Sequence, residues 1–404
     1  MSSREVYNER IIYTEAIFQA VATAGAMSYL SIFLVRLGAP SWLVGLYTSL
    51  PSLVMILAVL PVGTFVQRQK NLVATANWGR MIFRTVIGAF ALLPLLPPTV
   101  APYIMVAARS LISIPGSAVN IAVTTIWGKA TTPERRPRML STRMAVMGIF
   151  TAILGFLAGQ WLDFAPYPLN YQLLFLTAFF AGVGSVLTLS RLKLPEVSDE
   201  EIAGQKRVGV RDVLPLIRSV PAFRNFAIAA FIFRFGMSMP MALFPIYRVR
   251  VLGATDAWIG VLFTVQRVLS VGTYFTLGRL LAKPGFRNRL WLAALGMALF
   301  PLTTALATNT TMLLIPAVVG GLIAPGMNIF LTDTLIRVSP EDQRPAFVAM
   351  NSFLANMTAF VSPMIGTLLA DLLGIRIALV IAAAVRFVGG LFFWRLGVGT
   401  DRES

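Results

Sequence analysis

The stretch ATTPERRPRMLSTR at residues 130–143 has a counterpart, VSPEDQRPAFVAMN, at residues 338–351. Each stretch places an acidic residue and then an Arg-Pro pair between two long apolar runs, and the two lie 208 residues apart. A polar segment that occurs twice in a mostly apolar chain indicates a duplicated unit.

Further matches support this duplication. A spacing of 208 residues aligns the later parts of the two halves without a gap, and a spacing of 215 residues aligns the earlier parts. The aligned pairs include Asn120 and Asn328, Thr124 and Thr332, Asp163 and Asp371 at the first spacing, and Gly45 and Gly260, Gly63 and Gly278 at the second. Several of these residues are polar or lie in loops, so apolar similarity alone does not explain the matches.

The composition identifies the class of protein. The chain is 57% hydrophobic and 13% charged, whereas about 25% of the residues in a soluble domain are charged. Its apolar runs are about 20–25 residues long, which is the length that crosses a bilayer. There is no Cys and no His, so disulfides are excluded and any proton coupling must use a carboxylate.

Charge clusters and Gly/Pro turns divide the chain into twelve expected membrane helices. They cover roughly 11–35, 41–66, 73–95, 101–127, 143–162, 169–190, 223–247, 257–278, 290–307, 311–336, 346–371 and 375–396. With both termini in the cytoplasm, 24 of the 34 Lys and Arg residues fall in cytoplasmic segments and four in outer loops. This bias is what the positive-inside rule expects, and it predicts a multi-pass protein of the plasma or inner membrane.

The longest polar segment separates two halves of six helices. We expect an amino-terminal bundle at 1–190, a cytoplasmic linker at 191–222 and a carboxy-terminal bundle at 223–404. The linker ends in VLPLIRSVPAFRN, which suggests a helix on the membrane surface as readily as a plain connection. The predicted fold is all-α, with two pseudo-symmetric six-helix bundles related by an axis along the membrane normal, an arrangement typical of transporters.

Two loops carry a family resemblance. GTFVQRQKN at 63–71 follows the second predicted helix, and GRLLAKPGFRN at 278–288 follows the eighth. Their Gly and basic residues resemble the loop signature of the major facilitator superfamily, with Gln67 and Ala282 in the place of its Asp. TPERRPR, after the fourth helix, is similar to the family's next cytoplasmic loop. The resemblance implies that these loops gate the cytoplasmic side. The gating residues it implies are Gly63, Arg68, Gly278, Lys283 and Gly285. From their matching places in the repeat, we predict that Arg136 and Arg344 bridge helices on the cytoplasmic side and help to hold the outward-facing state.

Eight ionisable residues lie within the predicted helices, at least three residues from either end, where each is costly unless it faces a cavity or a partner. They are Glu15, Arg80, Arg84, Arg109, Arg234, Arg267, Asp333 and Arg386. The resemblance implies that the first, fourth, seventh and tenth helices line the central cavity, which makes Glu15, Arg109, Arg234 and Asp333 candidate substrate or coupling residues. For Arg80, Arg84 and Arg386, on helices that are peripheral in the family, we expect structural pairing.

Other candidates are polar or small. Gln266 and Arg267 on the eighth helix, together with Asn120, Asn328 and Asn356, are candidate substrate residues, although hydrogen bonding between helices explains the Asn residues equally well. Gly155 and Gly159 on the fifth helix, and SPMIG at 362–366 on the eleventh, indicate close helix packing by small residues.

These features predict a secondary transporter that moves a small organic solute by alternating access. Proton coupling through Glu15 or Asp333 is open. Six Arg against two acids within the helices favours an anionic solute. The alternatives are a multidrug/proton antiporter of the same superfamily, a membrane-embedded lipid-modifying enzyme and a non-transporting scaffold. We expect a monomer in the lipid bilayer, with no cofactor, metal, catalytic residue or nucleic-acid partner. No phosphate-binding loop of the GxxxxGK type is present.

Overall fold

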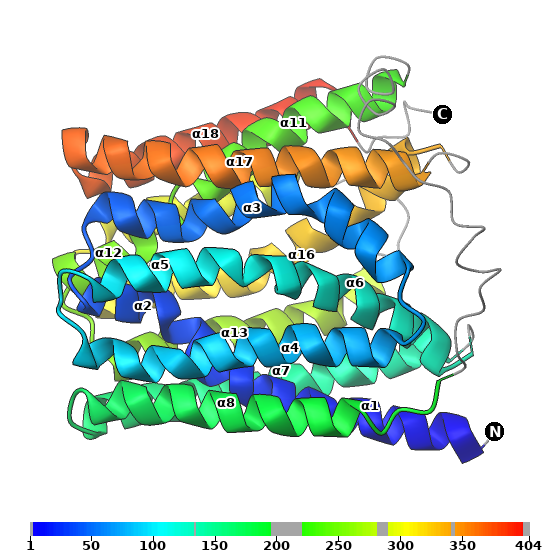
Figure 1. Cartoon of the computed structure of the whole chain (residues 1–404). Coiled ribbons are helices and arrows are strands. Elements are labelled where there is room, and N and C mark those ends of the chain that lie inside the picture. The colour runs from blue at the N-terminus through cyan, green and yellow to red at the C-terminus, as the bar shows by residue number, and fades with distance from the viewer. Residues whose placement is uncertain (1–2, 133–134, 195–219, 281–289, 341–343, 399–404) are drawn as a thin grey trace. The chain divides into compact units, whose positions relative to one another are not determined.

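The computed structural model describes residues 3–132, 135–194, 220–280, 290–340 and 344–398. Every regular element within these ranges is a helix (Figure 1). The helices divide into two compact units. Unit 1 comprises residues 1–39, 54–206 and 255–264, and unit 2 comprises residues 40–53, 207–254 and 265–404. Most of the linker expected at 191–222 and most of its surface helix lie outside the described residues.

Most helices of unit 1 come from the first half of the chain. They are α1 (Ser3–Ala22), the π-helical turn η1 (Thr23–Met27), α2 (Ser28–Arg36), α4 (Leu72–Ala89), the 3-10 turn η2 (Phe90–Leu95), α5 (Ala101–Leu111), α6 (Ser113–Ala130), α7 (Arg136–Phe164) and α8 (Leu169–Leu189). The fourth predicted membrane helix is therefore built from two pieces, α5 and α6, with a break at Ile112.

Most helices of unit 2 come from the second half. They are α11 (Pro221–Ser238), α12 (Leu243–Ile246), the π-helical turn η4 (Tyr247–Val251), α14 (Leu290–Met297), α15 (Leu299–Leu306), the 3-10 turn η5 (Thr311–Leu313), α16 (Leu314–Val338), α17 (Arg344–Leu373) and α18 (Ile375–Arg395). Aromatic side chains from α11, α17 and α18 fill much of its core, including the fully buried Phe223, Phe347 and Phe393.

Two helices are shared between the units. The first part of α3 (Ser41–Gln67) belongs to unit 2 and its remainder to unit 1, whereas the first part of α13 (Asp256–Leu280) belongs to unit 1 and its remainder to unit 2. The units therefore differ from a simple division at the linker, because the second helix of each sequence half starts in the other unit.

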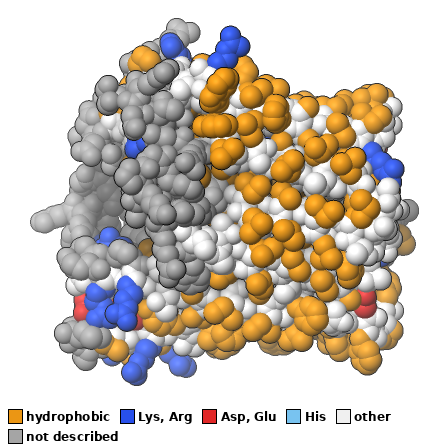
Figure 2. Space-filling view, turned by 180° about the vertical axis from the view of Figure 1, so that it is seen from behind, with side chains coloured by type: hydrophobic (Ala, Val, Ile, Leu, Met, Phe, Trp, Pro, Cys, Tyr) orange, Lys and Arg blue, Asp and Glu red, His pale blue; other side chains and the backbone are white. Residues whose placement is uncertain are grey.

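The membrane-spanning character of the chain is confirmed. Ten helical stretches among the described residues are long and apolar enough to cross a bilayer, and Leu290–Leu306 is a shorter apolar stretch. With α13, whose 25 residues match the eighth predicted span, these make up the twelve helices predicted from the sequence. Figure 2 shows hydrophobic side chains spread over one face, with Lys and Arg side chains gathered near its edges.

Helix ends repeat at the predicted spacings. Helices α7 and α17 start at Arg136 and Arg344, 208 residues apart, each at the Arg of an Arg-Pro pair. The second spacing, of 215 residues, relates the turns before α3 and α13. Gly38 and Gly253 adopt φ values of 82° and 62° there, in the left-handed region that side chains with a Cβ rarely enter. The same turn therefore uses the same glycine in both halves.

Candidate functional site

A buried carboxylate organises the interior of unit 1. Glu15 on α1 is 1% exposed and is reached by two arginines, Arg80 Nη1 on α4 at 2.8 Å and Arg143 Nη2 on α7 at 3.3 Å. Ser185 on α8 donates its hydroxyl to the same carboxylate at 3.2 Å and accepts a hydrogen bond from Arg80 at 3.0 Å. Four helices thus meet at one acid. We call Glu15, Arg80, Arg143 and Ser185 the Glu15 cluster.

The position of Arg143 corrects the sequence analysis. The expected helix begins at residue 143, but α7 begins at Arg136, so Arg143 lies two turns inside the helix and is buried. Its guanidinium lies 4.3 Å from the centre of the Trp127 ring on α6, a cation–π contact that a desolvated arginine favours.

The surroundings of the Glu15 cluster carry more positive than negative charge. Arg84, one turn after Arg80, donates Nη2 to the neutral side chain of Gln19 at 2.8 Å. Among the described residues, Arg84 Nη1 and Arg143 Nε are buried without a hydrogen-bond acceptor. Two guanidinium groups therefore contact a single carboxylate, and a third, that of Arg84, lies one helical turn from Arg80. The structural pairing expected of Arg80 and Arg84 is observed.

Unit 2 uses the corresponding helices differently. Arg234 on α11 donates Nη1 to Asn351 Oδ1 on α17 at 2.7 Å. The repeat aligns Asn351 with Arg143 at 208 residues and Arg234 with Gln19 at 215 residues. The first and fifth helices of each half are thus joined near equivalent positions, through an ion pair in unit 1 and through an arginine and an amide in unit 2. Arg234 has no acidic partner among the described residues.

Arg386 on α18 donates hydrogen bonds to backbone carbonyls. It is 1% exposed, and it donates Nη1 to Met297 O at 2.9 Å and Nη2 to Gly236 O and Met237 O at 3.3 and 3.1 Å. Pro240 and Pro301 stand four residues after Gly236 and Met297, and proline lacks the N–H that would bond these carbonyls in a helix. Arg386 therefore satisfies carbonyls that two prolines leave free inside an apolar bundle.

A second buried acid fixes the start of α13 within unit 1. Asp256 is buried and contacts Arg36 Nη2 at 3.3 Å, and Tyr171 donates its hydroxyl to Asp256 at 2.9 Å. The backbone N–H of Asp256 donates to Asp163 Oδ1, at the end of α7, at 2.9 Å. The repeat mate of Asp256 is Ser41, so the charged contact occurs in only one of the two copies of this joint.

Glycines let α13 and α7 approach closely in unit 1. A Cβ on Gly159 would lie 2.6 Å from the Tyr29 hydroxyl and 2.8 Å from the Asp256 carbonyl. A Cβ on Gly260 would lie 3.2 Å from Gly159 Cα. In unit 2 the corresponding residues are Gly45, which aligns with Gly260, and Thr367, which aligns with Gly159. A Cβ on Gly45 would lie 2.8 Å from Thr367 Oγ1. The close packing expected of Gly159 is observed.

This packing predicts opposite effects for two similar substitutions on α7. Gly159→Ala is expected to lower the free energy of unfolding by about 1–3 kcal/mol, because the added methyl meets backbone and a buried hydroxyl. Gly155→Ala, one turn earlier, has no atom within 4 Å of the added methyl and is expected to stabilise the helix by about 0.4–1 kcal/mol. Thermal unfolding of the two purified variants measures the difference, and equal shifts would contradict the close contact.

The remaining candidate substrate residues fall into two groups. Arg109, on α5, has a buried Nε with no acceptor, and Arg267, on α13, is exposed; no described residue forms an ion pair with either one. Asp333 on α16 pairs with Arg337 Nε, one turn later, at 3.2 Å. The neutral candidates lie at the surface or half-buried, and Asn356 donates to Ser352 O on its own helix. The exposed members are Asn120 and Asn328, and the half-buried ones are Gln266 and Asn356.

The predicted gating residues are placed only in part. Gly63 lies on α3, and Arg68 is exposed just after it. Arg136 and Arg344 occupy the first positions of α7 and α17, and Gly278 lies near the end of α13. Lys283 and Gly285 lie outside the described residues. The roles of these residues in gating stay predictions.

Comparison with known proteins agrees with this architecture. A family model described as Major Facilitator Superfamily matches residues 12–335. The chain belongs to this superfamily. It is therefore a multi-pass membrane transporter rather than an enzyme, and the readings as a lipid-modifying enzyme or a scaffold are set aside.

Individual members of the superfamily resemble the chain to different extents. The multidrug resistance protein MdtG of Proteus mirabilis (strain HI4320) is 32% identical over 162 residues, which cover 38% of this chain and 39% of that protein. A bacterial homologue of the human lysosomal transporter Spinster has a similar fold, with a TM-score of 0.73, 11% identity and coverage of 100% and 99% of the two chains. The human organic anion transporter MFSD10 has a TM-score of 0.65, 13% identity and coverage of 96% and 99%.

Several residues of these sites were not among the sequence candidates. Asp256, Tyr171 and Gln19 have ordinary sequence surroundings, and their partners lie far along the chain. The repeat gives one usable signal: Arg143 aligns with Asn351, and both turn out to bind the first helix of their half. The alignment of Arg143 with Asn351 could therefore have identified both as residues that bind the first helix of their half.

Proposed function

We propose that this transporter carries a small organic anion and moves it by alternating access. The supporting observation is the charge balance of the described membrane helices. Both acids predicted within them have arginine partners, Glu15 with Arg80 and Arg143, and Asp333 with Arg337. Arg109, Arg234 and Arg267 have no acidic partner among the described residues. Uncompensated charge within the membrane is costly, and an anionic solute would supply the compensating charge.

Arg234 is well suited to solute binding. It is half-buried, and its observed partners are the side-chain and backbone oxygens of Asn351, which hold the guanidinium in place without neutralising it. A guanidinium can bind a carboxylate or phosphate through two parallel hydrogen bonds.

Charge-retaining and charge-removing variants test this proposal. Arg109→Gln and Arg234→Gln are each expected to weaken binding of organic anions at least about tenfold, while Arg→Lys at the same positions keeps part of it because the charge remains. A thermal-shift screen of anionic, neutral and cationic compounds on purified protein identifies a ligand first, since a ligand of the folded state raises the unfolding temperature. Undiminished anion binding by the double Gln variant would contradict the proposal.

A multidrug/proton antiporter is the second candidate function. It is supported by the 32% identity with MdtG, which is limited to 162 residues. The same compound screen separates the two candidates, because stabilisation by lipophilic cations rather than by organic anions would favour the multidrug reading. The lysosomal transporter homologue and MFSD10 share the fold alone at their low identities.

We also propose proton coupling through Asp333 rather than Glu15. Glu15 is enclosed by two arginines and a serine, whereas the Asp333 side chain is 32% exposed and has a single arginine partner one turn away. Asp333→Asn is therefore expected to abolish uptake driven by an imposed pH gradient in proteoliposomes while leaving solute exchange without a gradient intact. Gradient-driven uptake that survives in this variant would exclude Asp333 as the coupling residue.

A further inference from the structure

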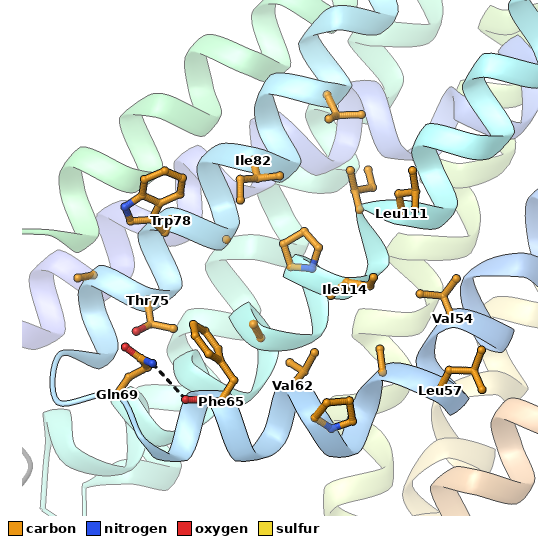
Figure 3. A pocket seen from close by; sticks show the side chains of 18 of the residues that line it. Val54, Leu57, Val62, Phe65, Gln69, Thr75, Trp78, Ile82, Leu111 and Ile114 are labelled. Carbon is orange, nitrogen blue, oxygen red and sulfur yellow. Dashed lines mark hydrogen bonds between the residues drawn. The ribbon is translucent and has the colours of Figure 1, made fainter.

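A large apolar groove opens on the side of unit 1 (Figure 3). It has a volume of about 1210 Å³, above the range of about 300–1,000 Å³ typical of small-molecule pockets. The second part of α3, helix α4 and the junction of α5 and α6 line it, and Figure 3 shows Phe65, Trp78 and Leu111 approaching it from these three elements. We call this space the lateral groove.

The groove exists because α4 packs on α6 but not closely on α3. On the α6 side the contact is tight, since a Cβ on Gly79 would lie 2.7 Å from Val119 and 3.0 Å from Pro115 O. On the α3 side there is room, and a Cβ on Gly63 would have no atom within 4 Å. Large apolar side chains stay exposed in this space, including Leu57 at 70% and Trp78 at 72%.

The lining chemistry fits a hydrocarbon chain. Apolar side chains from three elements line most of the groove, and its polar members are Gln69, Asn71 and Thr75. Figure 3 shows Gln69 and Thr75 together at one end. Gln69 donates its side-chain amide to Phe65 O at 3.3 Å. All other lining residues except Asn71 and Thr75 are apolar or glycine. A flexible methylene chain can follow such an irregular apolar surface and gain from each buried group.

A second cavity adjoins the polar end and is basic. It has a volume of about 490 Å³ and shares Asn71 and Ala74 with the lateral groove. Lys70 and Lys129 line it. Asn77 also lines it, with a buried Oδ1 that has no hydrogen-bond donor. This cavity therefore offers positive charge for a phosphate.

We propose that the two cavities together bind one anionic glycerophospholipid of the bilayer. Its acyl chain occupies the lateral groove, and its phosphate lies near Lys70 and Lys129. Basic pockets between membrane helices on the cytoplasmic side bind anionic headgroups in this manner, and these lysines lie at the end expected to face the cytoplasm. The bound lipid joins α3 to α4 where their side chains leave a gap.

Lipid retention by the full-length purified protein tests the site. Native mass spectrometry is expected to show one retained phosphatidylglycerol per chain. After delipidation, phosphatidylglycerol is expected to raise the unfolding temperature more than phosphatidylcholine with the same acyl chains. The Lys70→Gln/Lys129→Gln variant is expected to bind phosphatidylglycerol about thirtyfold more weakly. Ala58→Phe, which adds a ring to the groove wall, is expected to abolish retention of the lipid while keeping the fold, as checked by its unfolding in lipid-free detergent.

Lys193→Gln is the matched control. Lys193 lies at the same end of unit 1, but its ammonium packs over the ring of Tyr7 at 4.9 Å and it lines neither cavity. This variant is expected to retain phosphatidylglycerol like the parent chain. The proposal would be overturned if both lipids raised the unfolding temperature equally. It would also be overturned if the control and the double lysine variant lost phosphatidylglycerol binding equally, because the lipid would then contact the protein without a specific site. A dimer mass without retained lipid would assign the groove to a second copy of the chain and overturn the proposal.

Discussion

The Glu15→Gln variant is expected to unfold with a free energy about 3–5 kcal/mol lower than that of the parent chain. The substitution leaves Arg80 and Arg143 buried without a negative partner, together with the already amide-bound Arg84. Loss of one member of a buried ion pair is far more costly than loss of the whole pair. Tryptophan fluorescence during denaturation in detergent measures the change, and Trp127 beside Arg143 reports on this region.

Asp333→Asn provides the control for this prediction. Its ion pair with Arg337 is about one-third exposed on both sides, and such pairs contribute only about 0–1 kcal/mol. The double variant Glu15→Gln/Arg143→Gln should lose less stability than the sum of its single variants, because the charges are removed together. Additive losses, or equal losses for Glu15→Gln and Asp333→Asn, would show that the Glu15 cluster is not a coupled unit.

Arg386→Met is expected to destabilise unit 2 by at least about 3 kcal/mol, since each buried carbonyl left unsatisfied costs roughly 1–3 kcal/mol. Three carbonyls lose their donor, at Met297, Gly236 and Met237. The loss of bulk is small because methionine fills much of the space of the arginine stem. The measurement is again the free energy of unfolding in detergent.

Two prolines give this prediction a rescue. Pro240→Ala and Pro301→Ala restore N–H groups four residues after Gly236 and Met297, so helical hydrogen bonds can form without the arginine. The triple variant should therefore be more stable than Arg386→Met alone. A triple variant no more stable than the single one would show that Arg386 acts through packing rather than by satisfying the carbonyls freed by proline. Arg386→Lys should fall between the parent and the Met variant, because an ammonium lacks the fork that reaches two helices.

The repeat explains how much of the fold was predictable. Residues 130–143 and 338–351 predicted equivalent joints, and the structure starts α7 and α17 at Arg136 and Arg344. The turn glycines Gly38 and Gly253 followed the second spacing in the same way. Such features depend on local backbone chemistry and on the length of apolar runs, which can be read along a chain.

The candidate site was predictable only in part. Glu15 and Arg234 were recognised because ionisable groups in apolar helices are rare. Their partners were not, because Arg143 lies 128 residues from Glu15 and Asn351 lies 117 residues from Arg234. The sequence placed Arg143 at the start of a helix instead of in its interior, because the apolar run begins near residue 143 whereas α7 begins at Arg136.

The sequence by itself determined the class, the superfamily and the two-fold design of this protein, because composition, run length and an internal repeat are properties of the chain alone. Only the tertiary structure decided which charges neutralise one another. It showed that Glu15 pairs with two arginines and that Asp256 fixes the start of α13 in unit 1. It also showed that Arg386 donates to carbonyls that Pro240 and Pro301 leave without a backbone donor. The physical reason is that the free-energy cost of burying a charge depends on the groups that contact it. These groups come from helices far apart along the chain.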